Sequence, residues 1–353
     1  MSWLGNVYGL GAKYCIEASP GVRRGDAGRF HQVWQDEHVD APRVLIVGSG
    51  IAGVACARAL RSAGIAPRVV DRGRQPGGRM ASRNLNGRTV DIGAAYFTAQ
   101  PGTLFGALVE DWVKRQLARA WTDTIAVAQA EGIQGSSTGP VRYAATAGLR
   151  ALVADLARDL DIEQETTVEH VAPGIVDGQH YDAVVLAVPD PQAARLLDAD
   201  SPLQTELAAA WLPSIAVVLE WQSRQWVPFH AAFVNNTPEV LTLADDGDRR
   251  GDDAAVLVAH TTEALAREHL DDPDGAIAPT SAAVQRLLKL PDAPTRAFAH
   301  RWSFARPSTQ HPEPFHWHDG IGVCGDAWGE RSSVGTAWSS GDALGRAIAA
   351  SFA

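Results

Sequence analysis

The sequence contains few cysteines and no long uninterrupted apolar run. Three cysteines among 353 residues, Cys15, Cys56 and Cys324, lie far apart and form no C-x-x-C pair, so their spacing predicts neither a zinc site nor a disulfide framework. No apolar run approaches the roughly 20 residues that a membrane-spanning helix needs, and we therefore expect no membrane partner. A cytoplasmic location fits this cysteine usage.

Excess positive charge is absent too. The chain carries 31 Lys and Arg against 41 Asp and Glu, a formal net charge of −10, and a phosphate backbone would repel such a chain. This balance argues against a nucleic-acid partner and favours a small-molecule one. Near the start, Arg23 and Arg24 precede no apolar segment, so residues 1–42 are not predicted to be an export signal. Their glycine and charge content predicts a disordered extension instead.

A β-α-β pattern begins directly after this extension. Residues 44–47 form a short apolar run, mostly β-branched, that ends in glycine, as buried parallel strands do. Apolar residues over 51–60 follow helical spacing, and a second strand is expected at 68–71. The turn between the first strand and the helix, residues 48–53, has the sequence GSGIAG and matches G-x-G-x-x-G.

Each glycine of this turn has a physical task. Gly48 allows the tight turn, Gly50 lets the backbone approach a pyrophosphate, and Gly53 lets helix and strand pack closely. The first helical residues, Ile51 and Ala52, offer backbone N–H groups to the phosphates. The turn therefore predicts a Rossmann-type dinucleotide site.

The residues after the second strand favour flavin over a nicotinamide cofactor. Asp71 has about the spacing expected for the carboxylate that accepts the ribose hydroxyls. Residues 72–80, RGRQPGGRM, resemble the second dinucleotide motif of the flavin amine oxidase superfamily. That resemblance implies FAD, with predicted contacts from Arg72, Gly78, Arg79 and Met80.

A second likeness to the same superfamily lies near the C-terminus. Residues 325–344 resemble its closing flavin motif, in which the aspartate sits near the ribityl and phosphate portion. The positive end of the helix that follows would stabilise the negative charge of reduced flavin. The predicted cofactor contacts from this half of the chain are Gly325, Asp326, Val334, Gly335, Thr336 and, further upstream, Val168.

Four stretches resemble renalase-like proteins, particularly the bacterial members. They are residues 91–98 (DIGAAYFT), 142–152 (RYAATAGLRAL), 187–193 (AVPDPQA) and 300–307 (HRWSFARP). Leu149 and Phe304 depart from the Met and Tyr of the family pattern. The likeness spans about residues 43–353.

The resemblance implies an oxidase with non-covalent FAD that converts the 2- and 6-dihydro isomers of NAD(P)H to NAD(P)+, with dioxygen as acceptor. The ring nitrogen of such a substrate drives hydride departure, so no catalytic side chain is strictly required. Tyr96, Trp302 and Phe304 are candidate walls of the substrate chamber. Two alternatives stay open: a flavin-dependent amine oxidase, and a flavin-binding protein without turnover.

The chain as a whole predicts an α/β fold, in which a Rossmann-type FAD-binding domain is joined to a second, mixed-sheet substrate domain. The FAD-binding domain is expected at 43–100, 141–190 and 316–353, and the substrate domain at 101–140 and 191–315. Further predicted elements are a helix over 149–156 and strands at 166–171, 181–188, 215–221 and 254–260. Apolar, glycine-rich sequence at 320–326 precedes a further predicted helix that carries Leu344 and Ile348.

No metal site is predicted. His311, His316 and His318 are close together, but their Pro-rich setting provides no rigid helix face for two ligands. Cys324 is expected to be a buried apolar cysteine, because its surroundings differ from the covalent-flavin cysteine pattern of monoamine oxidases.

Overall fold

The computed structural model describes residues 41–353, and it places the predicted β-α-β unit in a six-stranded sheet. The strand order is β18-β19-β12-β1-β2-β8, and all neighbours are parallel except β18 and β19. The strands are β1 (Val44–Val47), β2 (Arg68–Val70), β8 (Asp161–Glu163), β12 (Ala183–Leu186), β18 (His316–His318) and β19 (Ile321–Val323). The predicted extension 1–42 lies almost wholly outside the described residues.

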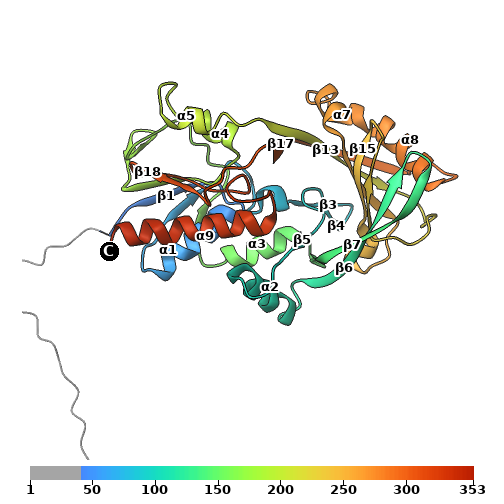
Figure 1. Cartoon of the computed structure of the whole chain (residues 1–353), viewed down its shortest axis with the longest axis horizontal. Helices are drawn as coiled ribbons and strands as arrows, with labels where there is room; N and C mark the ends of the chain where they lie inside the picture. Colours follow the sequence, from blue (N-terminus) through green and yellow to red (C-terminus); the bar gives the residue numbers. More distant parts are fainter. Residues whose placement is uncertain (1–40) are drawn as a thin grey trace, which may run out of the picture. The chain divides into compact units, whose positions relative to one another are not determined.

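Apolar residues cover both faces of this sheet. Successive residues of β1 alternate between two cores, as strand geometry requires, and all four are buried. On one face pack α1 (Ile51–Ser62), α2 (Leu104–Lys114), α3 (Leu149–Ala157) and α9 (Val334–Ser351) (Figure 1). On the other face pack α4 (Asp190–Ala194), α5 (Leu203–Glu206) and a small sheet of β9 (Val171–Ala172), β10 (Ile175–Val176) and β11 (Gln179–His180).

The closest helix contact joins the two ends of the described chain. A Cβ built on Gly341 of α9 would lie 2.0 Å from the carbonyl oxygen of Ala52 in α1, and one built on Gly345 would lie 2.5 Å from that of Cys56. Only a residue without a side chain allows this approach. Helices α1 and α9 therefore lie side by side, as Figure 1 shows. No helix within residues 41–353 is long and apolar enough to cross a membrane.

A mixed eight-stranded sheet forms the second lobe, as predicted. Its order is β17-β13-β16-β15-β14-β6-β7-β5, and its neighbours are antiparallel except for β14 and β6. The strands are β5 (Phe97–Thr98), β6 (Arg119–Gln129), β7 (Gly132–Ala144), β13 (Trp211–Glu220), β14 (Ala231–Val234), β15 (Val240–Asp245), β16 (Val256–Thr261) and β17 (Arg296–Pro307).

Helices and a hairpin cover the two faces of the second sheet. One face packs against α7 (Glu263–Glu268) and α8 (Ile277–Leu288). The other packs against the hairpin of β3 (Ser82–Leu85) and β4 (Arg88–Asp91), which leaves the first lobe directly after its second glycine motif. A short helix, α6 (Asp246–Arg250), follows β15. The hairpin thus connects the predicted cofactor loop to the predicted substrate sheet.

Two predictions need correction. The strand over 166–171 is wrong: Glu169 and His170 donate their backbone N–H groups to Asp177 instead of to a strand, and β8 pairs with β2. The boundaries at 101 and 191 were set too early. The apolar stripe of α2 packs into the helix-covered core of the first lobe, and α4 and α5 cover the opposite face of the first sheet.

We expect Gly341→Val to destabilise the protein by about 1–3 kcal/mol or more, because the added side chain must displace α9 from Ala52. Urea unfolding followed by circular dichroism measures this loss. Ala350→Val, at an exposed position of the same helix, is the control and should cost no more than about 0.7 kcal/mol, the difference in helix propensity. Equal losses in the two variants would contradict the packing argument.

Candidate functional site

The glycine turn lies between β1 and α1, the context that the motif requires. Gly48 donates its N–H to the carbonyl of Val70, and a Cβ on Gly53 would lie 2.0 Å from the carbonyl oxygen of Gly48. Gly50 caps α1 without a side chain, so no side-chain oxygen occupies the helix N-terminus. The first N–H groups of a helix have no intrahelical partner, so those of α1 suit an anionic group.

The second glycine pair packs on this turn. Gly77 donates its N–H to the carbonyl of Ser49 at 3.0 Å, and a Cβ on Gly78 would lie 3.3 Å from the Cα of Gly50. Gly78 also has a φ of +51°, which side-chain-bearing residues rarely adopt. The two predicted motifs therefore form one backbone cradle.

Asp71 is bonded to this cradle. Its Oδ2 accepts from the N–H of Ser49 at 2.6 Å and from the Ser49 hydroxyl at 2.8 Å, and its Oδ1 accepts from Gly73. A carboxylate has further lone pairs, so these bonds leave room for a ribose hydroxyl. Beside it, Gln164 donates to the Ser49 hydroxyl, and its buried Oε1 has no partner among the described residues. Sequence reasoning missed Gln164, because the strand before it was predicted five residues too late.

Arg79 and Asp326 meet as a bidentate ion pair, with Nη–Oδ distances of 3.0 and 2.5 Å. Arg79 also donates to the carbonyl of Ala305 on β17, and its guanidinium lies 4.9 Å from the ring centroid of Trp211. The Asp326 side chain is only 8% exposed and accepts a bond from Ser332. Arg79 thus contacts both Asp326 and two strands of the second sheet, β17 at Ala305 and β13 at Trp211.

Two buried indole N–H groups lie in the core that adjoins this ion pair. Within residues 41–353, Nε1 of Trp211 and Nε1 of Trp328 have no hydrogen-bond partner. Buried donors are normally satisfied, so both indoles suit a polar ligand that carries acceptor atoms. Neither tryptophan belongs to a motif, and sequence alone gave no signal for them.

The remaining predicted cofactor residues have varied surroundings. Ser333 caps α9 and accepts from the N–H of Thr336, so the helix starts at Val334 as predicted. A Cβ on Gly335 would meet the ring of Phe105 at 3.1 Å. Arg72 is exposed, whereas Gly325, Met80 and Val168 lie in or next to the cores.

The three predicted chamber residues pack in different clusters. Tyr96 packs with Trp121 and beneath the guanidinium of Arg142. Trp302 joins the cluster between the β3–β4 hairpin and the second sheet, and its Nε1 donates to the carbonyl of Ile92 at 2.7 Å. Phe304 packs on the core beneath the first sheet. Trp302 therefore lies where the two lobes meet, and Tyr96 and Phe304 do not join it in one cluster.

Two histidines flank Ala216 on the same sheet. Ala216 of β13 pairs with His260 of β16 on one side and with His300 of β17 on the other. Burial, with Arg249 nearby, lowers the pKa of His260 to about 4, although contacts with the backbone of residues 92–93 oppose the shift. Burial and neighbouring arginines lower the pKa of His300 to about 4 as well. Both imidazoles are neutral at physiological pH, and sequence reasoning had assigned no role to either.

A buried ion network connects the lobes. Asp91 accepts from the N–H of Leu149 at the start of α3 and lies 3.0 Å from Arg250. Asp246 pairs with Arg249 and Arg250, and both acidic side chains are at most 1% exposed. Burial would raise the pKa of Asp246, but the surrounding arginines hold it below its ordinary value. Asp91, in the stretch that resembles renalase-like proteins, thus connects the end of β4 to α3 and α6.

The candidate metal ligands face separate carboxylates. His311 lies 2.9 Å from Asp190, and the other pairs are His316 with Glu206 and His318 with Asp319. Within residues 41–353, no group of three or more His, Cys, Asp or Glu residues is arranged to hold a metal ion. Burial raises the pKa of the Cys324 thiol to about 12, which agrees with a buried apolar cysteine.

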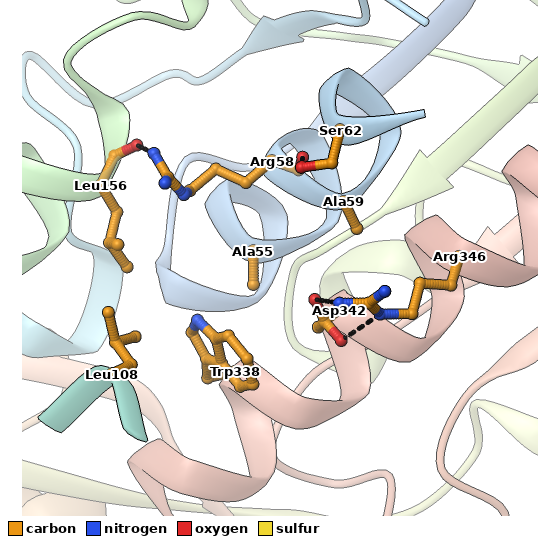
Figure 2. Close-up of a pocket in the computed structure, with 9 residues that line it drawn as sticks. All are labelled: Ala55, Arg58, Ala59, Ser62, Leu108, Leu156, Trp338, Asp342 and Arg346. Carbon is orange, nitrogen blue, oxygen red and sulfur yellow. Dashed lines mark hydrogen bonds and ion pairs between the residues drawn. The ribbon is translucent and has the colours of Figure 1, made fainter. Parts of the chain in front are cut away.

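A pocket of about 160 Å³ is lined by residues of α1, α2, α3 and α9 (Figure 2). In Figure 2 Arg58 bonds to the carbonyl of Leu156, and Arg346 pairs with Asp342. None of the glycine-turn residues lines this pocket, and its volume falls below the roughly 300–1,000 Å³ of most ligand sites. It is a surface hollow separate from the cradle.

Sequence comparison places this architecture among known proteins. Residues 46–112 match a family model described as an NAD(P)-binding Rossmann-like domain. Renalase of Mus musculus is 24% identical over 296 residues, which cover 75% of this chain and 85% of that protein.

Solved structures share the fold. A putative protoporphyrinogen oxidase from Exiguobacterium sp. 255-15 aligns with a TM-score of 0.72 and 15% identity, covering 88% of this chain and 99% of that one. Wild-type putrescine oxidase bound to putrescine aligns with a TM-score of 0.63 and 14% identity over the same shares of the two chains. The chain therefore has a mixed α/β fold with a Rossmann-like dinucleotide-binding domain, as predicted.

Replacing Asp71 by Ala should weaken FAD binding about 10- to 100-fold, the usual effect of losing hydrogen bonds to a charged group. Titration of flavin-free protein with FAD, followed by flavin fluorescence, measures the dissociation constant. Asp161→Ala changes an exposed carboxylate on the neighbouring strand and should leave the affinity unchanged. Wild-type affinity in Asp71→Ala would remove Asp71 from the cofactor site.

The depressed pKa of His260 predicts acid sensitivity. An unfolded chain protonates this histidine near its ordinary pKa of 6.5, whereas the folded protein resists protonation down to about 4. The free energy of unfolding should therefore fall as the pH decreases through this window. Between pH 7.5 and 5.0 we expect His260→Gln to lose about 2 kcal/mol less stability than wild type in urea unfolding. His318→Gln, at a 73% exposed side chain, should behave like wild type, and identical losses in all three proteins would contradict the argument.

Proposed function

We propose that this chain is an FAD-dependent oxidase, similar to renalase, that oxidises 2- and 6-dihydro isomers of NAD(P)H to NAD(P)+ with dioxygen as acceptor. The observation that carries the proposal is the position of Arg79. It pairs with Asp326 beside the double glycine cradle, and it bonds to the strand that bears Trp302 and His300. A cofactor held by the cradle would therefore face the second sheet at that strand.

The chain is an FAD-dependent oxidoreductase, and it holds FAD non-covalently. The cradle, the carboxylate of Asp71 and the unpartnered Oε1 of Gln164 suit the adenosine and pyrophosphate portion. The Arg79–Asp326 pair and the indole N–H of Trp328 suit the ribityl and flavin portion. Sequence likeness to mouse renalase over 75% of the chain agrees with this assignment.

The reaction needs little from the side chains. A dihydronicotinamide ring gives up a hydride, one proton comes from solvent, and dioxygen leaves as hydrogen peroxide. Bound FAD supplies the two-electron acceptor that no side chain provides. The protein's contribution is to hold the ring in place and to exclude water.

Two features of the second sheet suit this role. The bond from Trp302 Nε1 to Ile92 fixes the indole ring, which offers a flat apolar surface to a nicotinamide. His260 remains neutral, so it can bond to a carboxamide without repelling the positive charge that develops on the oxidised ring. An amine substrate would need a base for its ammonium proton, and the dihydronicotinamide does not.

We expect the 2- or 6-dihydro isomers of NAD(P) to reduce the flavin rapidly under anaerobic conditions, because the ring nitrogen of these substrates drives hydride departure. The limiting rate should change little between about pH 6 and 9, since no obligatory base titrates there. Stopped-flow absorbance of the flavin measures it. Faster bleaching by benzylamine, spermine or another amine would replace this assignment with an amine oxidase, and no bleaching by any of these compounds would favour a flavin-binding protein without turnover.

A further inference from the structure

Three cationic or hydrogen-bonding side chains from distant parts of the chain meet at the edge of the hairpin. Arg83 comes from β3, Arg150 is the second residue of α3, and His300 comes from β17. The Arg83 guanidinium lies over the ring of Phe298, two residues before His300 on β17, and the backbone N–H of Arg150 donates to the hydroxyl of Ser82, the neighbour of Arg83. In agreement with this placement, burial and then Arg83, Arg150 and Arg301 lower the pKa of His300, and burial and then Arg83 lower the pKa of Arg150. Two arginines therefore lie near one imidazole.

No acidic side chain neutralises this cluster. Within residues 41–353, neither guanidinium lies within ion-pair distance of a carboxylate; Arg83 lies 4.7 Å above the ring of Phe298, and Arg150 donates to the amide oxygen of Gln75. Among the described residues, Asp91 is the one carboxylate that raises the pKa of Arg150, and it already pairs with Arg250. In the described part of the chain Arg150 Nε is buried and has no partner. Unpaired arginines that face one another favour an anion between them.

The cluster adjoins the predicted cofactor cradle. A Cβ on Gly77 would lie 3.2 Å from Cγ of Arg150, whereas a Cβ on the next residue, Gly78, would lie 3.3 Å from the Cα of Gly50. The stem of Arg150 thus packs on the second glycine turn in a direction different from that of Gly50. Ligand binding to FAD-loaded protein separates a substrate phosphate at Arg150 from a phosphate of the cofactor.

The cluster continues the row that contains Trp302. Phe298, His300 and Trp302 are alternate residues of β17 and share the face that packs toward the hairpin. The rings of His300 and Trp302 are in edge-on contact, with centroids 4.6 Å apart, and the backbone of Phe298, whose ring lies beneath Arg83, is about 13 Å along the strand from Trp302. A nicotinamide ring at Trp302 would place its ribose and phosphates over His300 and the two arginines.

We propose that Arg83, Arg150 and His300 form a subsite for the phosphate groups of the dinucleotide substrate, an assignment that rests on the proposed function. The ligand class is a nucleotide with a pyrophosphate or ribose phosphate. Arginine matches phosphate geometry with two parallel N–H donors, and His300 adds a neutral N–H. The subsite binds the part of the substrate that takes no part in the reaction.

The test uses FAD-loaded protein and the variants Arg83→Gln and Arg150→Gln; the second keeps the Cβ and Cγ atoms of Arg150 that pack on Gly77. The ligands are NAD+, inorganic pyrophosphate and two reducing substrates: 6-dihydro-NAD and the dihydronicotinamide riboside, which has no phosphate. Arg301→Gln is the matched control, because Arg301 loses the same charge on β17 but donates to the carbonyl of Leu270.

We expect each of the two variants to raise the dissociation constants of NAD+ and pyrophosphate about tenfold, as loss of one charge-assisted bond does. The dissociation constant of 6-dihydro-NAD should rise by the same factor, while its limiting reduction rate and the kinetics of the riboside stay unchanged. The control should bind NAD+ as wild type does.

The outcomes separate the two claims. Variants that bind NAD+ and pyrophosphate as tightly as wild type, or no more weakly than Arg301→Gln, would overturn the subsite even if 6-dihydro-NAD reduces the flavin. Weakened binding of both ligands in Arg83→Gln and Arg150→Gln would support the subsite even if neither substrate reduces the wild-type flavin, and the proposed function would then fail alone.

Discussion

The contact between two backbone turns determines how the rest of the molecule is arranged. A Cβ on Gly78 would lie 3.3 Å from the Cα of Gly50, a tight contact at a φ of +51° that favours glycine, and the bond from Gly77 to Ser49 fixes the register of the two turns. Arg79 follows at once, and its carbonyl accepts from Ala94 and lies against Gly93. The chain therefore passes within a few residues from the dinucleotide turn to the segment that contacts Trp302 and His260.

Buried charge maintains this relation between the lobes. Asp91 at the end of the hairpin bonds to the start of α3 and pairs with Arg250 of α6, which lies in the second lobe. Removing one partner of such a pair leaves an uncompensated buried charge, so the network tolerates only one arrangement of hairpin, helix and sheet. The network thereby links the hairpin that follows the glycine turns to the second sheet.

Local motifs made much of this predictable. The strand, turn and helix around residues 48–53 and the helix that begins at Val334 follow from spacing and turn chemistry that involve only neighbours in sequence. In the second sheet, the apolar runs at 215–221 and 254–260 predict β13 and β16, whereas its longest strands, β6, β7 and β17, were not predicted. Short strands were harder to predict. Strand β8 has only three residues, too few to show a period-2 pattern, and the strand was predicted instead at the nearby run 166–171, which contains β-branched residues.

The parts of the site that depend on distant contacts could not be predicted. Nothing near Gln164, Trp211 or His260 in sequence reports that each lies beside residues a hundred or more positions away, or that burial leaves the imidazole neutral. The same holds for the arginine cluster, whose members come from three elements. Conversely, Tyr96 and Phe304 stand in recognisable motifs, yet they pack in clusters apart from Trp302.

The central claim is that three segments of one chain build a single non-covalent FAD site. Acid denaturation of the purified protein, followed by separation and identification of the released flavin, tests it most directly. The account predicts one FAD per chain in the supernatant and none in the precipitate, and rebinding of one FAD per chain after refolding. Flavin that stays with the precipitated protein, or a protein that neither carries nor rebinds FAD, would contradict it.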